Sequence, residues 1–367
     1  MKIFLLGAGG FIGSHLIEKI LNESGHEVVA FDLNGESLVP FMGRERFSFH
    51  QGDLFKETEW IEEQVAACDV VLPFAGVAKP AYYLSKPLWT FELDFEQNLK
   101  VVRMCAKHGK RVVFPSTSEV YGLSSDGVLL EDESPLIVGP IAKMRWIYSC
   151  GKQMMDRVIT AYGQEQGLRY TLFRPFNWIG PRLDTLEDAR EHRARSITQI
   201  IYDILNRGEV TLVAGGEQRR SFTWIGDGTD ALMRILENDG GRADGQIFNI
   251  GNPANNASVR ELAEMIISVM REMPRFAAKV EDVKLVSIPS ERYYSNGYDD
   301  MKNRVPSIEK MKKLLGWTPR TGLRDAIRMT LEAFDHSPSG GDYHTYAVYS
   351  VSPNGEELRR KQGISEP

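Results

Sequence analysis

Cysteine is scarce in this sequence: 367 residues contain three, Cys68, Cys105 and Cys150. Their number and spacing match neither a disulfide framework nor a zinc site, so we expect no bound metal and a reducing, cytoplasmic setting. Long apolar runs are also missing, and no window approaches the roughly 20 apolar residues of a membrane span. The apolar stretch at the amino terminus gives way to glycines after a few residues, which is too short for a secretory signal peptide.

Positive charge is not in excess either. Lys and Arg number 44 against 50 Asp and Glu, and the formal net charge is -6. Proteins that bind nucleic acid or anionic membranes typically carry a basic surface, so the composition disfavours both partners. The apolar and charged shares, 42% and 26%, are ordinary for a globular protein. The length is sufficient for one large α/β domain or a fold of two lobes.

Short apolar runs alternate with helical segments over the first 175 residues. The apolar runs lie at 2–6, 27–32, 69–74, 111–116 and 169–174. Between the first two, Ile12, Leu16 and Ile20 recur at the spacing of one helix face. Continuous apolar strands separated by helices are typical of a parallel sheet covered on both faces. The sequence therefore predicts an α/β fold with a doubly wound parallel sheet of the Rossmann type.

A glycine-rich turn, GAGGFIG, follows the first predicted strand. Gly7, Gly10 and Gly13 permit a tight turn and close backbone approach, so the following helix can receive a pyrophosphate at its amino end. Asp32 ends the second predicted strand, where a carboxylate accepts hydrogen bonds from a ribose diol and repels a 2′-phosphate. The pattern predicts NAD rather than NADP. A glycine turn that binds nothing is the alternative.

Two further segments complete the predicted cofactor site. Asp53 is expected at the adenine, and Ala75–Gly76 is expected to let the chain pass close to the phosphates. The residues that we expect around NAD are Gly7, Gly10, Phe11, Ile12, Gly13, Asp32, Asp53, Leu54, Ala75, Gly76, Tyr148 and Lys152.

The chain changes character after residue 175, where elements become shorter and loops longer. We predict that residues 1–175 form mainly the NAD-binding Rossmann domain. Residues 176–335 are expected to form mainly a smaller C-terminal substrate-binding lobe, with some exchange of chain between the two. Residues 336–367 are polar and rich in Gly and Ser, which predicts a C-terminal extension.

Tyr148 and Lys152 stand four residues apart in a predicted helix at about 146–167, so they share one face. An ammonium near a phenol favours the phenolate and lowers the phenol pKa from about 10. We therefore predict Tyr148 as the base and Lys152 as its support and as a ligand of the nicotinamide ribose. A chance surface pair is the alternative. The hydroxyl-rich segment PSTSEVYG at 115–122 favours catalysis, because it leaves an apolar strand at its carboxyl end, beside the cofactor.

The glycine loop, STSEVYG, YxxxK and RPFNWIGPR together resemble the extended short-chain dehydrogenases/reductases that act on nucleotide sugars. Within them the chain is similar to the UDP-glucuronate decarboxylases, including the decarboxylase domain of a bifunctional polymyxin-resistance enzyme and the UDP-xylose/UDP-apiose synthases. The matching stretches run in order over about residues 1–335. The resemblance implies an NAD-dependent enzyme that converts UDP-glucuronate to UDP-4-keto-pentose, UDP-xylose or both. It also implies a homodimer formed through the Tyr-Lys helix and a helix at about 90–109.

The same resemblance implies roles for individual residues. Thr117 and Ser118 would orient the 4-hydroxyl and the carboxylate of the sugar. Glu119 would be the acid or base of the decarboxylation, and Arg304 would act near the carboxylate. The implied substrate-binding residues are Asn177, Arg182, Arg195, Arg220 and Tyr298. Thr211 is a departure, because the polymyxin-resistance relative has a lysine in that segment.

Two other functions stay open. The first is a UDP-sugar 4-epimerase or a sugar-nucleotide dehydratase of the same superfamily. Dehydratases place an Asp-Glu pair where this chain has Ser118-Glu119, and the epimerases usually lack a glutamate at position 119, so both contrasts favour decarboxylation. The second is a non-catalytic, NAD-sensing Rossmann protein. Such proteins tend to lose the Tyr or the Lys, and this chain keeps both.

Overall fold

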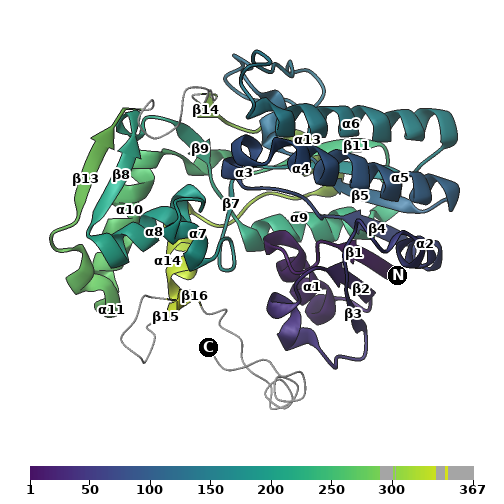
Figure 1. Ribbon diagram of the computed structural model, residues 1–367, viewed down its shortest axis with the longest axis horizontal. Helices are drawn as coiled ribbons and strands as arrows, with labels where there is room; N and C mark the ends of the chain where they lie inside the picture. The colour runs from purple at the N-terminus through teal and green to yellow at the C-terminus, as the bar shows by residue number, and fades with distance from the viewer. Residues whose placement is uncertain (290–300, 302, 336–343, 346–367) are drawn as a thin grey trace.

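The structure is a computed structural model that describes residues 1–289, 301, 303–335 and 344–345. Its centre is a seven-stranded parallel sheet in the order β11-β6-β5-β4-β1-β2-β3 (Figure 1). The strands are β1 (Lys2–Leu6), β2 (Glu27–Asp32), β3 (Phe47–Gln51), β4 (Val70–Pro73), β5 (Arg111–Pro115), β6 (Tyr170–Pro175) and β11 (Gln246–Ile250). The strand order reverses between β1 and β4, which is the switch point of a doubly wound sheet. The predicted α/β fold and Rossmann-type sheet are confirmed.

Helices cover both faces of this sheet. One face carries α1 (Phe11–Glu23), α9 (Ile225–Glu237) and α13 (Glu309–Leu315), and the other carries α2 (Thr58–Ala67), α5 (Asn98–Lys107) and α6 (Trp146–Gln166). Successive side chains of β1 serve both layers: Ile3 and Leu5 pack on the first side, Phe4 and Leu6 on the second. Burial on both faces explains why the strands are continuous apolar runs in the sequence.

A second group of elements has a hydrophobic core of its own. Its helices are α7 (Leu186–Arg190), α8 (Ser196–Arg207), α10 (Val259–Glu272), α11 (Pro274–Ala277) and α14 (Leu323–Glu332). Its strands are β8 (Glu209–Val213) with β13 (Lys284–Ile288), and β9 (Arg219–Ser221) between β12 (Asn256–Ser258) and β14 (Asn303–Arg304). The chain also returns to the first group after residue 175, because β11 joins the main sheet and α9 packs on α1.

Short elements connect these helices and strands. They are η1 (Glu36–Phe41), α3 (Pro80–Ser85), α4 (Pro87–Phe91), η2 (Glu92–Gln97), η3 (Ser118–Tyr121), η4 (Ala214–Gly216), β7 (Trp178–Ile179), β10 (Thr223–Trp224), η5 (Asp239–Gly241), η6 (Pro253–Asn255), η7 (Ala278–Val280), β15 (Phe334–Asp335) and β16 (His344–Thr345). The segment η2 is a π-helix between α4 and α5, so the helix predicted at about 90–109 contains one widened stretch. Such π-helical turns are frequent at functional sites.

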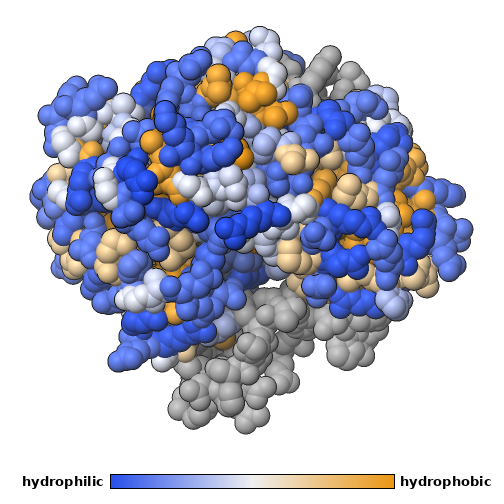
Figure 2. Space-filling model, turned by 180° about the vertical axis from the view of Figure 1, so that it is seen from behind, coloured by the Kyte–Doolittle hydropathy of each residue, from blue (hydrophilic) through white to orange (hydrophobic). Residues whose placement is uncertain are grey.

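The surface is mixed in character. Figure 2 shows hydrophilic residues over most of the face opposite to that of Figure 1, with separate hydrophobic patches between them. Among the helices in the described ranges, none combines the length and the apolar character that crossing a bilayer requires.

Candidate active site

The glycine loop lies between β1 and α1 and packs against the end of β4. Gly7 has a φ of +78°, and a Cβ placed there would lie 2.4 Å from the backbone nitrogen of Ala75. A Cβ on Gly13 would lie 2.6 Å from the carbonyl oxygen of Gly7. In the described chain no side chain caps α1 at Gly10, and the first turn holds no acidic residue. The amino end of α1, with Phe11 and Ile12, therefore fits the pyrophosphate of a dinucleotide.

Asp32 lies directly beside this loop at the end of β2. Its Oδ2 accepts a hydrogen bond from the Gly9 amide at 2.8 Å, and Oδ1 accepts one from the Asn34 amide at 3.2 Å. Burial raises the pKa of Asp32, and these backbone amides work against that shift. A carboxylate at this point fits a ribose diol, as predicted for NAD.

The other predicted cofactor residues also lie along the carboxyl edge of the sheet. Asp53 accepts a hydrogen bond from the Phe55 amide at 3.0 Å, which lowers its pKa, and Leu54 is buried in the core below. The carbonyl oxygen of Ala75 accepts a hydrogen bond from Asn98 at 2.9 Å. Contact of these residues with NAD remains a prediction.

Tyr148 and Lys152 lie on the buried face of α6, as the spacing predicts. The Lys152 ammonium lies 5.9 Å from the centre of the Tyr148 ring. It donates to the Pro115 carbonyl at 3.0 Å, pairs with the Asp94 carboxylate at 3.3 Å, and lies 4.7 Å above the Phe114 ring. The two residues therefore face the same site, and the ammonium is held mainly by other partners.

The Tyr148 phenol does not have the lowered pKa that the sequence predicts. Burial raises the pKa of the Tyr148 phenol, and the negative charges of Asp94 and Glu119 raise it further. Hydrogen bonds with the Thr117 and Tyr83 hydroxyls oppose the rise. The prediction failed because it counted one cation and neither the loss of water nor the two carboxylates.

Tyr83 is not among the residues that the sequence patterns predict for the site. Its ring stacks on that of Tyr148, with centroids 4.4 Å apart and planes 7° from parallel. Tyr83 belongs to the short helix α3 and is buried, and burial raises its pKa well above the usual value. The phenol ring of Tyr148 therefore packs directly against a second phenol ring.

Glu119 lies between two buried guanidinium groups. Its Oε2 accepts a hydrogen bond from Arg145 at 3.0 Å, and its Oε1 pairs with Arg304 at 3.3 Å. Thr117 caps η3 by accepting a hydrogen bond from the Glu119 amide at 3.2 Å, and Ser118 is buried beside it. The structure thus brings four of the predicted catalytic residues together with Arg145, which the sequence analysis missed.

A buried polar network holds the end of β5 in place behind these residues. Ser116 donates to Asp156 at 2.8 Å, and Arg174 bridges Asp156 at 3.3 Å to the Tyr121 hydroxyl at 2.9 Å. Tyr121 in turn donates to Asn249 on β11 at 2.8 Å. Burial raises the pKa of Asp156, and the Arg174 charge opposes that shift. This network fixes the segment that carries Thr117, and periodicity gave no sign of it.

Two of the predicted substrate residues lie on β9 and directly after β6. Arg220 on β9 is the register partner of Arg304 on β14, and it donates to the Met301 carbonyl at 3.0 Å. Asn177 follows β6 with a φ of +41°, and its Nδ2 is buried without a hydrogen-bond partner among the described residues. A buried amide nitrogen of this kind fits an acceptor supplied by a ligand. Tyr298 lies outside the described residues.

The remaining two arginines lie beside α1 and are already paired with carboxylates. Arg182 donates to Glu18 at 2.8 Å. Arg195 forms an ion pair with Asp184 at 2.9 Å, and its guanidinium lies 5.7 Å from the Phe11 ring. These contacts place both arginines on the cofactor side of the site, and phosphate binding by them remains a prediction.

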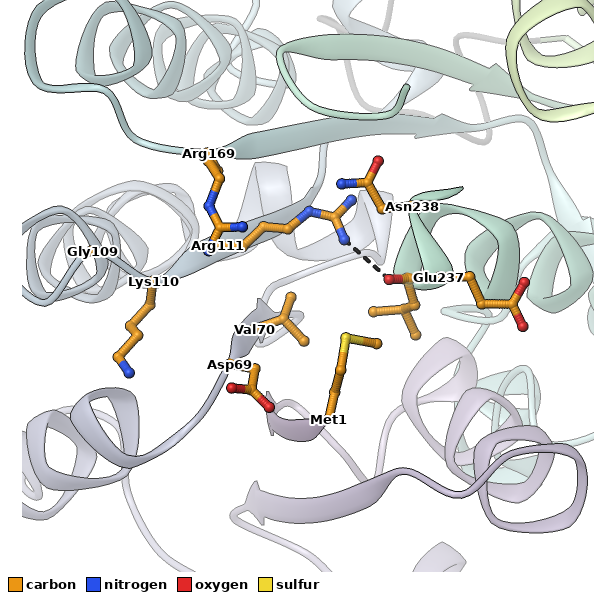
Figure 3. Close-up of a pocket in the computed structure, with 10 residues that line it drawn as sticks. Met1, Asp69, Val70, Gly109, Lys110, Arg111, Arg169, Glu237 and Asn238 are labelled. Carbon is orange, nitrogen blue, oxygen red and sulfur yellow. Dashed lines mark hydrogen bonds between the residues drawn. The ribbon is translucent and has the colours of Figure 1, made fainter. Parts of the chain in front are cut away.

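A hollow lies at the opposite edge of the sheet, lined by residues that include Met1, Asp69, Lys110, Arg111, Arg169 and Glu237 (Figure 3). Arg111 donates to the carbonyl oxygens of Ile235 at 2.7 Å and Leu236 at 3.2 Å, so it closes the last turn of α9. Ligands of open α/β sheets bind at the carboxyl ends of the strands, whereas this hollow lies at their amino ends. We therefore assign Arg111 to anchoring α9.

No metal-binding arrangement stands out either: in the part of the chain that the structure describes, no three His, Cys, Asp or Glu side chains are grouped to hold an ion.

Comparisons with known proteins agree with this fold. Residues 3–251 match the family described as "NAD dependent epimerase/dehydratase family". A solved structure, the PbgP3 protein from Burkholderia pseudomallei, is 46% identical with a TM-score of 0.81, over 90% of this chain and 95% of that one. A UDP-glucuronic acid 4-epimerase from Bacillus cereus, solved with UDP-glucuronic acid and NAD, is 22% identical with a TM-score of 0.73, over 90% and 98%. The UDP-glucose 4-epimerase of Thermotoga maritima is 23% identical with a TM-score of 0.73, over the same shares. At these lower identities the likeness is one of fold.

Proposed function

Because this chain belongs to the NAD dependent epimerase/dehydratase family, with NAD as its cofactor, we propose that it oxidises and decarboxylates UDP-glucuronate. The observation that carries the proposal is the ion pair between Glu119 and Arg304, at 3.3 Å across 185 residues of sequence. A glutamate and an arginine that share one buried place beside a base suit a reaction in which a carboxylate is lost. The catalytic roles that follow are part of this proposal.

The chemistry assigned to the chain has two stages. Tyr148 takes the proton of the sugar 4-hydroxyl, with the Thr117 hydroxyl orienting the oxygen, and bound NAD supplies a hydride acceptor for carbon 4. The resulting 4-ketone lies β to the carboxylate. The bond between carbons 5 and 6 then breaks, carbon dioxide leaves, and the electron pair moves into the carbonyl to form an enolate. Arg304 stabilises the negative charge, and Glu119 delivers or relays the proton that carbon 5 accepts.

The choice of a UDP-linked uronic acid draws on two kinds of support. The first is the sequence resemblance to UDP-glucuronate decarboxylases. The second is the relative from Bacillus cereus, whose solved complex contains UDP-glucuronic acid together with NAD. In this chain Asn177, Arg182, Arg195 and Arg220 are the proposed ligands of the nucleotide diphosphate. A 4-epimerase of a UDP-sugar is the second candidate, because two of the compared structures are described as such enzymes.

One assay separates these functions. The purified protein is mixed with NAD and UDP-glucuronate carrying a labelled carboxylate, and released carbon dioxide is measured while NMR identifies the nucleotide sugar. We expect carbon dioxide with UDP-4-keto-pentose or UDP-xylose. Reduced cofactor in solution would accompany the keto product, whereas its retention would accompany UDP-xylose. Formation of the 4-epimer without carbon dioxide would replace the decarboxylase proposal with the epimerase one.

We also propose that the protein forms a homodimer through α6 and the helix predicted at about 90–109, together with α4, which leads into that helix. The surface of these packed helices exposes apolar side chains: Leu88 is 72% exposed, Met154 52% and Trp89 38%. Large apolar side chains exposed on two packed helices are typical of an interface. We expect Leu88→Asp with Met154→Asp to halve the mass measured by light scattering. Val128→Asp, at another exposed apolar residue, is the control and should leave the mass unchanged; a monomeric wild type would contradict the proposal.

A further inference from the structure

Asp94 is buried beside Lys152, and nothing in the sequence patterns marked it. Its side chain is 2% exposed, and that of Lys152 is 4% exposed. Oδ1 lies 3.3 Å from the Lys152 ammonium, and Oδ2 accepts a hydrogen bond from the Val77 amide at 2.9 Å. The carboxylate is therefore held at both oxygens between the end of β4 and α6. A buried ion pair requires such additional hydrogen bonds to be stable.

Two features of the backbone bring Asp94 to this place. It lies in the π-helical segment η2, whose widened turn packs against α6. Gly76 leaves the space, because a Cβ there would lie 2.5 Å from Oδ1 of Asp94. An ordinary α-helical turn or an alanine at 76 would displace the carboxylate from Lys152. The arrangement thus depends on two local departures from regular structure, which is typical of a functional position.

We propose that Asp94 is a positioning residue of the oxidation step, which fixes the Lys152 ammonium and limits how much of its positive charge acts on Tyr148. The inference rests on the proposed roles of Tyr148 and Lys152 in the preceding subsection. Lys152 then has three anchors, Asp94, the Pro115 carbonyl and the Phe114 ring. The working unit is a Tyr-Lys-Asp arrangement instead of a Tyr-Lys pair.

Several other groups also affect the ionisation of the Tyr148 phenol, and they stay unchanged when Asp94 is replaced. The groups that face Tyr148 are Tyr83 from α3, Asp94 from η2, Thr117 and Glu119 from the β5–η3 segment, and Lys152 from α6. Of these, Asp94 and Glu119 oppose ionisation of Tyr148. Removing the charge of Asp94 while keeping its size therefore removes one opposing charge and frees the ammonium to favour the phenolate.

The test compares Asp94→Asn with the wild type in a first turnover, in which reduction of bound NAD by UDP-glucuronate is followed by absorbance across pH. The phenolate is the active form, so the rate rises with pH through the pKa of Tyr148. We expect Asp94→Asn to reduce bound NAD about tenfold faster than the wild type at each pH below the pKa of Tyr148, which corresponds to a midpoint about one unit lower. A readout without turnover is the ¹³C resonance of the hydroxyl-bearing ring carbon of Tyr148, assigned through Tyr148→Phe and titrated with NAD bound. It should move in the same direction.

Asp203→Asn is the matched control. Asp203 is a buried carboxylate of α8 that pairs with Arg207 at 2.9 Å, away from the site. Both variants remove the carboxylate that pairs with a cation, so both should lower the melting temperature, and Asp94→Asn alone should move the midpoint. If Asp94→Asn does not fold, Asp94→Ser makes the same comparison in a smaller side chain.

An unchanged midpoint in Asp94→Asn, or an equal shift in Asp203→Asn, would overturn the inference. Failure of the proposed function looks different. The wild-type reaction would then release no carbon dioxide. The pH comparison would be made with whichever nucleotide sugar reduces the bound cofactor. This is possible because removal of the hydroxyl proton precedes every later step.

Discussion

Replacing Tyr148 with phenylalanine is expected to lower the rate of NAD reduction by UDP-glucuronate by roughly 10³-fold. The substitution removes the phenolate oxygen that is proposed to accept the proton of the sugar hydroxyl. It keeps the ring that stacks on Tyr83 at 4.4 Å, so the packing of α3 on α6 should survive. Stopped-flow absorbance of the reduced cofactor measures the rate.

The control for this prediction is Tyr162→Phe. Tyr162 lies on the same helix and packs, partly buried, against the hydrophobic core on the α2–α5 side of the sheet. The same atom is removed there, and near-normal reduction of NAD is expected. Binding of NAD and the melting temperature should be close to those of the wild type in both variants. Near-normal turnover in Tyr148→Phe would show that another group is the base.

The second large effect is expected at the Glu119–Arg304 ion pair. Glu119→Gln and Arg304→Ala should each slow release of carbon dioxide by roughly 10²-fold, because each removes a charged group proposed to act on the carboxylate or the enolate. Binding of UDP-glucuronate, measured by calorimetry, should change much less. Since the two side chains are in contact at 3.3 Å, the double variant should lose less than the product of the single losses.

Arg219→Ala is the matched control for Arg304→Ala. Arg219 lies one residue from Arg220 on β9, but its side chain is 38% exposed and pairs with Glu261 at 2.9 Å on α10. We expect normal carbon dioxide release from this variant. Equal losses of binding and of carbon dioxide release in Glu119→Gln and Arg304→Ala would make the pair structural and would remove both from the proposed mechanism.

Much of the fold could be predicted because its determinants are local. The strands at 2–6 and 27–32 match β1 and β2 in their bounds, and Tyr148 and Lys152 share the buried face of α6. In each case the decisive feature, an apolar run or a spacing of four residues, lies within one element. The position of β11 in the main sheet could not be read in this way, because pairing with β6 joins residues far apart in the chain.

The positions of the glycine loop and of the residues that end each strand could likewise be predicted from the sequence. Parallel strands carry their carboxyl ends to one edge, so Asp32 beside the loop and Thr117 after β5 follow once the strands are known. Tyr83, Asp94 and Arg145 were missed for the opposite reason. Each lies in a short or irregular segment or at the start of a helix. In such segments no sequence periodicity predicts which residues the side chain contacts.

The sequence by itself determined the two-sided α/β core, the glycine turn between β1 and α1 and the shared face of Tyr148 and Lys152, since backbone hydrogen bonding and side-chain period operate over a few residues. Only the tertiary structure decided the charges around them. It set Asp94 against Lys152 at 3.3 Å and Glu119 between Arg145 and Arg304. Those pairings join distant segments, and the ease with which a group ionises depends on the water it has lost and on every charge nearby.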